Sequence, residues 1–164
     1  MDTQKAAVYA WETTFRTFNE NNTPRRRLRR LIRRAERRYR IPPSKIIFTN
    51  RVHRSKKHAK IASEYDPENH SITLGHNDHN YAIALHETAH AITDYLLGYD
   101  LEPHGPQWFG VYLELLEWAK VAPREALHAS AAARGLEWAP AGRVGPRTIR
   151  RAYAGMVAKR ALDG

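Results

Sequence analysis

Apolar residues recur every three or four positions in the first forty residues of the chain, which is the spacing of one face of a helix. Residues 3–20 show this spacing and predict a first helix. Residues 24–39 predict a second, with Thr23 suited to the N-cap and Pro24 to the first helical position. We therefore expect two N-terminal helices within residues 1–40.

Four further helices are expected in the second half of the chain. Residues 81–97 are apolar over most of the surface that a helix presents, which is typical of a buried helix, and Gly98 ends it. Pro106 opens another apolar helix. Residues 123–135 predict a shorter helix that a glycine ends, and residues from 146 onward predict a last, basic one.

Short apolar runs in the middle of the chain predict strands at residues 45–50, 60–65 and 71–74, and the last two read as a hairpin with residues 66–70 as its turn. The pattern favours an α+β fold with a short antiparallel sheet. We expect a single domain over residues 1–164, in which the N-terminal helices (1–40), a core (41–122) and a helical appendage (123–164) follow one another.

The most informative stretch lies inside the predicted buried helix, where His86, Glu87 and His90 form an HExxH motif. Residues i and i+4 lie one turn apart on one helix face, so His86 and His90 can hold one metal ion. Glu87 projects beside the pair, where it can act as a general base on water at that ion without ligating it. These residues predict a catalytic Zn²⁺ site.

A catalytic zinc site needs a third protein ligand, and the sequence offers two kinds of candidate. His104 stands just before the helix that Pro106 opens, and a close approach or an unusual backbone angle at Gly105 would bring it back to the ion. Glu114 or Glu117 would serve instead in an arrangement like that of thermolysin. His104 is the preferred ligand, and both schemes stay open at this point.

Arginine dominates the helix predicted over residues 24–39. Residues 25–40 hold ten arginines and one glutamate, and so carry +9 of the chain's net charge of +10. The guanidinium matches phosphate oxygens, so this face suits a DNA or RNA backbone without readout of the bases. A solvated charged face or an anionic membrane surface would fit the same pattern. The candidate nucleic-acid-binding residues are Arg25, Arg26, Arg29, Arg30, Arg33, Arg34 and Arg37.

The two histidine segments together resemble a known family. HExxH at residues 86–90, followed by His-Gly-Pro-Gln-Trp-Phe at residues 104–109, resembles the SprT-like zinc metalloproteases, including the Spartan type. The resemblance covers about residues 44–120. It implies a compact zincin-like core with His86, His90 and His104 as zinc ligands and Glu87 as the general base. Spartan-type members act on proteins attached to DNA, which would suit the Arg-rich helix.

We therefore expect a zinc-dependent metallopeptidase that acts on protein or peptide substrates. Tyr112 is a candidate donor to the oxyanion of the reaction. Two other functions remain open: a nucleic-acid-binding protein with a structural or vestigial zinc site, and a metal-dependent hydrolase of non-peptide amides.

The remaining composition narrows the chemistry and the location. The chain has no cysteine, which excludes disulfides, cysteine-ligated zinc and thiol catalysis. No apolar run has the length of a membrane span, and residues 1–5 lack the apolar segment of a secretory signal. We expect a cytoplasmic protein, and the composition suits a bacterial or phage origin.

Overall fold

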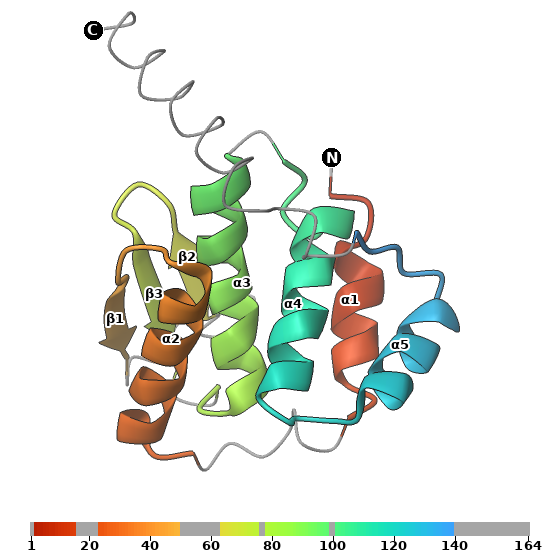
Figure 1. Ribbon diagram of the computed structural model, residues 1–164, viewed down its shortest axis with the longest axis horizontal. Helices are drawn as coiled ribbons and strands as arrows, with labels where there is room; N and C mark the ends of the chain where they lie inside the picture. Colours follow the sequence, from red (N-terminus) through yellow and green to blue (C-terminus); the bar gives the residue numbers. More distant parts are fainter. Residues whose placement is uncertain (1, 16–22, 50–62, 76–77, 99–100, 140–164) are drawn as a thin grey trace, which may run out of the picture.

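The computed structural model describes residues 2–15, 23–49, 63–75, 78–98 and 101–139, and these residues form a mixed α+β fold. The elements are α1 (Lys5–Glu12), α2 (Arg25–Tyr39), β1 (Lys45–Phe48), β2 (Glu64–Asp66), β3 (Ser71–Leu74), α3 (Tyr81–Leu97), α4 (Pro106–Trp118) and α5 (Arg124–Ala132). Figure 1 shows the sheet on one side of the molecule, with α2 and α3 beside it and α4, α1 and α5 farther from it.

The three described strands form a mixed sheet in the order β1-β3-β2. Ile72 of the central strand pairs with Tyr65 in an antiparallel register and with Ile46 in a parallel one. The predicted hairpin is confirmed, but the expectation of an antiparallel sheet is wrong for β1. A tight turn makes β2 and β3 antiparallel, whereas β1 reaches β3 through a long connection that permits parallel pairing.

Helix α3 occupies the centre of the fold because it packs against α2, α4 and the strands β2 and β3. This burial explains why its sequence is apolar on nearly every side. The predicted start is confirmed, since the Asn80 side chain accepts a hydrogen bond of 2.8 Å from the Ile83 amide. At the other end Gly98 has a φ of 92°, a backbone conformation that suits glycine.

Several helix boundaries in the structure differ from the predicted ones. The first helix ends at Glu12 rather than continuing to residue 20, and residues 16–22 lie outside the described part. Pro24 has extended backbone angles and caps α2, which therefore begins one residue later than predicted. The loop at 51–58 and the basic helix from 146 onward also lie outside the described residues. None of the helices in the described ranges is long and apolar enough to cross a membrane.

Candidate metal centre

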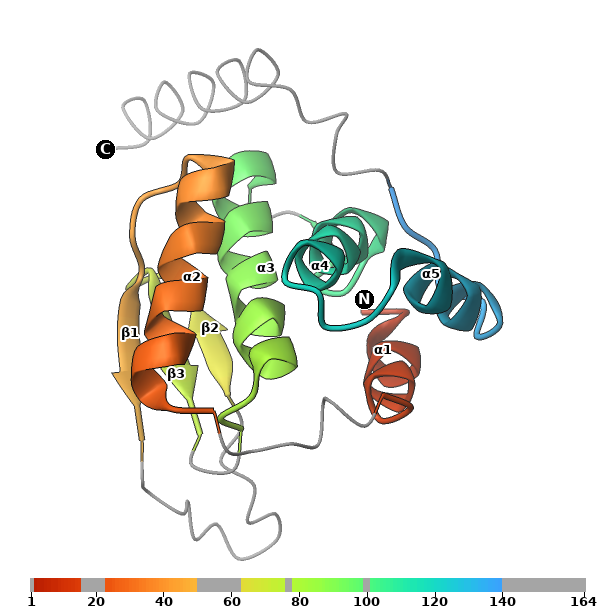
Figure 2. The same cartoon turned by 60° about the horizontal axis from the view of Figure 1, so that its bottom comes forward.

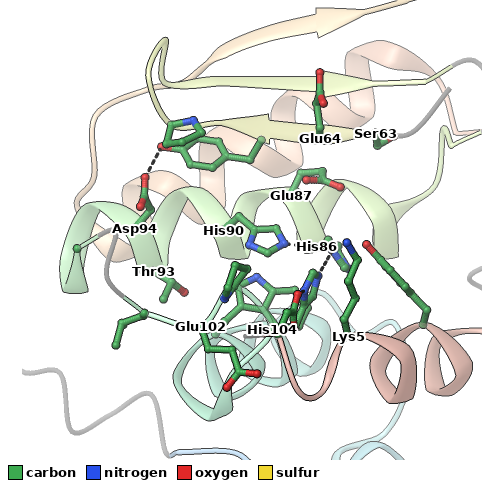
Figure 3. Close-up of a pocket in the computed structure, with 18 residues that line it drawn as sticks. Lys5, Ser63, Glu64, His86, Glu87, His90, Thr93, Asp94, Glu102 and His104 are labelled. Atoms are coloured by element: carbon green, nitrogen blue, oxygen red, sulfur yellow. Dashed lines mark hydrogen bonds and ion pairs between the residues drawn. The ribbon is translucent and has the colours of Figure 1, made fainter. Parts of the chain in front are cut away.

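Three histidines converge beside the central helix. His86 and His90 project from α3, and His104 comes from the segment that precedes α4 (Figure 3). The Nε2 atom of His86 lies 3.3 Å from Nε2 of His90 and 3.3 Å from Nε2 of His104. Two nitrogens bound at about 2.0–2.1 Å to one tetrahedral ion lie about 3.3–3.4 Å apart. Both distances therefore match histidine nitrogens on one tetrahedral ion, and among the described residues these three histidines are close enough together to bind one metal ion.

The turn before α4 brings His104 back to the helix. The Gly105 amide donates a hydrogen bond of 2.9 Å to the Glu102 carbonyl. A Cβ atom at residue 105 would lie only 3.0 Å from the Glu102 Cβ and 3.1 Å from the Glu102 carbonyl oxygen. Its φ of −69° is ordinary. Glycine at residue 105 therefore avoids a tight contact with Glu102, and no unusual backbone angle calls for it.

Two carboxylates contact the Nδ1 atoms of His86 and His104, on the side of each ring away from the clustered Nε2 atoms. Glu12 Oε1 lies 2.7 Å from His86 Nδ1, and Asp2 Oδ2 lies 2.6 Å from His104 Nδ1. A carboxylate accepts a hydrogen bond, so both Nδ1 atoms carry a proton, and in the neutral form that a metal requires both rings present Nε2 lone pairs. Two such lone pairs 3.3 Å apart repel each other unless a cation lies between them. The donor set thus fits a divalent metal ion that prefers imidazole ligands, such as zinc.

Glu87 lies on the strand side of His86 and His90, opposite His104 (Figure 3). Glu87 is buried, with 6% of its surface exposed. Burial raises the pKa of Glu87 to about 7, although the charge of His86 and a backbone hydrogen bond from Tyr65 act in the other direction. A carboxyl group with this pKa can both accept and release a proton near neutral pH.

The histidine rings differ in their electrostatic surroundings. Burial would lower the pKa of His86, but the adjacent Glu12 carboxylate outweighs it and the pKa is raised. Burial lowers the pKa of His90 well below its usual range, and the nearby rings of His86 and His104 add to this. Burial also lowers the pKa of His104, although Asp2 opposes the shift. His90 and His104 therefore favour the neutral form that a metal requires.

The Trp108 ring contacts all three histidine rings, stacked against His90 and edge to face with His86 and His104. Its ring centroid lies 4.7 Å from that of His86, 4.8 Å from that of His90 and 4.7 Å from that of His104. The residue is 1% exposed. The aromatic position of the His-Gly-x-x-Trp segment thus restricts the orientation of all three rings.

A cavity of about 550 Å³ opens beside the histidines. Its walls include all three histidines and Glu87, together with residues of α1, of β2 and of the segment that holds His104. These residues include Lys5 and Tyr9 of α1, Glu64 and Tyr65 of β2, and Glu102 near His104. Asp94 of α3 also lines the cavity. The cavity is large enough for several residues of a peptide or for a small molecule.

The structure separates the other predicted site residues from the cluster. Glu114 pairs with Arg38 at 3.3 Å and Glu117 with Arg124 at 3.5 Å, so these carboxylates are engaged elsewhere. Tyr112 is fully buried, and its hydroxyl donates a hydrogen bond of 2.8 Å to Glu12 Oε1. The prediction that Tyr112 faces the oxyanion is wrong, because this residue lies behind His86.

The arginines of α2 do not line the cavity. Helices α2 and α1 lie on opposite sides of α3 in Figure 1 and Figure 2, and the three-histidine cluster faces α1. Arg33 points into the fold, where it pairs with Glu36 at 2.6 Å and donates to the Ser44 carbonyl at 2.7 Å. It therefore differs from the other six candidates, which are exposed: Arg25, Arg26, Arg29, Arg30, Arg34 and Arg37.

Aromatic rings engage three of these exposed arginines. The guanidinium groups of Arg25 and Arg29 each lie 5.5 Å from the centre of the Phe48 ring, and that of Arg34 lies 5.3 Å from the Trp118 ring. Among the predicted residues, Arg26, Arg30 and Arg37 have no recorded aromatic or acidic partner within the described part of the chain.

Comparison of the chain with protein-family models, with curated proteins and with solved structures found no match in any of the three. The site is therefore interpreted from its own chemistry.

Proposed function

We propose that this chain is a zinc-dependent metallopeptidase of the SprT-like type. The observation that carries the proposal is the spacing of 3.3 Å from His86 Nε2 to the Nε2 atoms of both other histidines, beside a buried glutamate and an open cavity. Three protein ligands with a free position on the ion distinguish a catalytic zinc site from a structural one. Glu87 lines the same cavity beside His86 and His90, which is the place that a general base needs.

Zinc, when bound, supplies a Lewis acid that lowers the pKa of water toward neutrality and polarises a carbonyl group. Glu87 then accepts a proton from the attacking water and later delivers it to the leaving amine. His86, His90 and His104 serve to hold the ion, and Trp108 beneath them keeps the rings in place.

Strand β2 supports a peptide as the substrate in preference to other amides. Within the described sheet β2 is an edge strand, and Ser63, Glu64 and Tyr65 line the cavity. An extended peptide can add to such an edge through main-chain hydrogen bonds. A substrate bound in this way would lie next to Glu87.

The proposal is tested with Glu87→Gln. We expect zinc-loaded wild type to cleave casein or histones, and the variant to retain zinc while activity falls about 100-fold or more. Glu68→Gln, at an exposed position of the hairpin turn that does not line the cavity, is the matched control and is expected to keep full activity. A Glu87→Gln variant as active as wild type would contradict the role of Glu87, and wild type that binds zinc but cleaves neither substrate would favour a zinc-containing binding protein.

Nucleic acid is a second candidate partner, and it would bind the face of α2. The outward position of Arg26, Arg30 and Arg37, away from the cavity, favours it. We expect the triple alanine variant to lose most affinity for duplex DNA, and the affinity of wild type to fall steeply with salt. Arg134→Ala, an exposed arginine that follows α5, is the control. If the triple variant binds duplex DNA as tightly as wild type, the arginine face of α2 does not bind DNA and is only a solvated charged surface.

A further inference from the structure

Both carboxylates that contact the metal-binding histidines come from one short N-terminal segment. Asp2 and Glu12 stand just before and at the end of α1, and they contact His104 and His86, which are 102 and 74 residues away in the chain. Their side chains are 20% and 16% exposed, and each histidine side chain is 5% exposed. The two contacts are largely protected from water.

We propose that residues 2–12 form part of the metal centre, and that Glu12 and Asp2 are positioning residues for the ion. Each carboxylate fixes its histidine in the tautomer whose Nε2 lone pair faces the cluster, and each makes that nitrogen more basic. This inference rests on the metal-binding part of the proposed function and does not depend on peptidase activity.

Glu12 is held firmly enough for this role. Trp11, its neighbour in the chain, is fully buried and donates a hydrogen bond of 2.8 Å from Nε1 to Ser130 Oγ. The hydroxyl of Tyr112 donates to the same Glu12 oxygen that contacts His86. These contacts fix the carboxylate from two sides, so that the orientation of His86 follows from the docking of α1.

The beginning of the segment is attached to the loop that carries His104. The Thr3 hydroxyl donates a hydrogen bond of 2.6 Å to Glu102, and the Thr3 amide donates to the same oxygen. Gln4 Nε2 lies 3.3 Å from the carbonyl oxygen of His104 itself. Asp2 is therefore fixed relative to the histidine that it contacts.

The charges also favour a divalent cation at this site. Three neutral imidazoles leave both positive charges of such an ion uncompensated in a largely buried position, which is unfavourable. Glu12 and Asp2 supply two negative charges on the far side of the rings. The charges of the ion and of the two carboxylates sum to zero. This charge balance favours binding of the ion, in addition to the selection of the histidine tautomers.

The test is zinc affinity, measured by competition with a chromogenic chelator, for the full chain and for Glu12→Gln, Asp2→Asn and the double variant. We expect each single change to weaken zinc binding by about 10- to 100-fold and the double change to weaken it further. Glu64→Gln is the matched control, because it removes a negative charge from the same cavity wall without a recorded contact to a histidine among the described residues. We expect that control to bind zinc within about threefold of wild type.

A second measurement separates positioning from loss of structure. Nitrogen-15 NMR of the histidine rings should show the proton on Nδ1 of His86 and His104 in zinc-loaded wild type, and unfolding of the zinc-free variants should remain cooperative. Folded variants that bind zinc within about threefold of wild type would overturn the inference and leave the metal centre intact. Wild type without zinc affinity would instead overturn the metal centre and this inference together, whereas zinc binding without peptidase activity would overturn only the enzymatic proposal.

Discussion

Glu12 and His86 are 74 residues apart in the sequence and are joined by a contact of 2.7 Å between Oε1 and Nδ1. The contact connects α1 to the face of α3 that carries His86 and His90. Because Tyr112 donates to the same oxygen of Glu12, the chain Tyr112–Glu12–His86 links three helices behind the cluster. The first helix is thereby a structural component of the site.

Tyr112→Phe should destabilise the protein without emptying the metal site. The change removes the hydroxyl that donates to Glu12, so a buried carboxylate oxygen loses one of its two donors. We expect the free energy of unfolding in urea to fall by about 1–2 kcal/mol and zinc affinity to fall less than in Glu12→Gln. Tyr81→Phe, on α3, should change stability by less than about 0.5 kcal/mol. If Tyr112→Phe and wild type have the same free energy of unfolding, the hydrogen bond to Glu12 contributes nothing to stability.

Tyr9→Phe should slow peptide hydrolysis. Tyr9 is 43% exposed, lines the cavity and stacks on His86 with ring centroids 5.8 Å apart. Burial, followed by the charge of Glu87, raises the pKa of Tyr9 to about 12, so its hydroxyl remains a donor across the neutral range. We expect kcat to fall by about 10- to 100-fold with KM and zinc content little changed. An unchanged kcat would exclude Tyr9 as a donor to the reacting carbonyl.

Glu36→Ala should be destabilising, because it removes a buried carboxylate that accepts from both the partly exposed Arg33 and the Ser44 amide. Glu36 is 1% exposed, pairs with Arg33 at 2.6 Å and accepts a hydrogen bond of 2.8 Å from the Ser44 amide. We expect a loss of about 1–3 kcal/mol in urea unfolding, because the Ser44 amide loses its acceptor. Arg30→Ala, on the exposed face of the same helix, should lie within about 0.5 kcal/mol of wild type. Similar losses in the two variants would contradict the distinction between Arg33 and the exposed arginines.

Asp94→Asn should alter how stability depends on pH. Burial raises the pKa of Asp94 from 3.8 to about 6, opposed by a hydrogen bond from Tyr65 and by His70. The fold therefore favours the protonated carboxyl, and this contribution is complete below about pH 4 and is lost as the pH rises through about 6.

In zinc-free protein at about pH 7.5, we expect Asp94→Asn to be more stable than wild type by about 1 kcal/mol, a value reduced for solvent screening at a half-buried group. The difference should vanish near pH 4 because the wild-type carboxyl is then protonated. Urea unfolding at both pH values measures it. A difference of the same size at both would mean that ionisation of Asp94 is not its cause.

The sequence predicted the parts of the site that follow a local rule. His86 and His90 are one turn apart on a long apolar helix, and the glycine after His104 marked a close approach of the chain. Asp2 and Glu12 follow no such rule. Each is a single acidic residue whose partner lies far away in the chain, so only the tertiary packing of α1 reveals the contact.

The same distinction applies to the fold. Helical spacing gave α2, α3 and α4 to within a residue or two at their starts, because burial of one face imposes that spacing. The parallel pairing of β1 with β3 could not be predicted, since a four-residue apolar run carries no information about its partner. Tyr112 shows a related difficulty, because its position on an apolar helix was compatible with facing the cavity or with lying behind His86.

The metal content of the purified protein tests the central claim most directly. Wild type and His128→Ala, a histidine outside the cluster, should each retain about one zinc ion per chain after zinc loading and exhaustive dialysis, as measured by mass spectrometry of the elements. His104→Ala should be folded and should retain less than about 0.1 ion per chain, because two histidines alone do not hold the ion through dialysis. Wild type that retains no zinc, or His104→Ala that retains as much as wild type, would contradict the three-histidine centre.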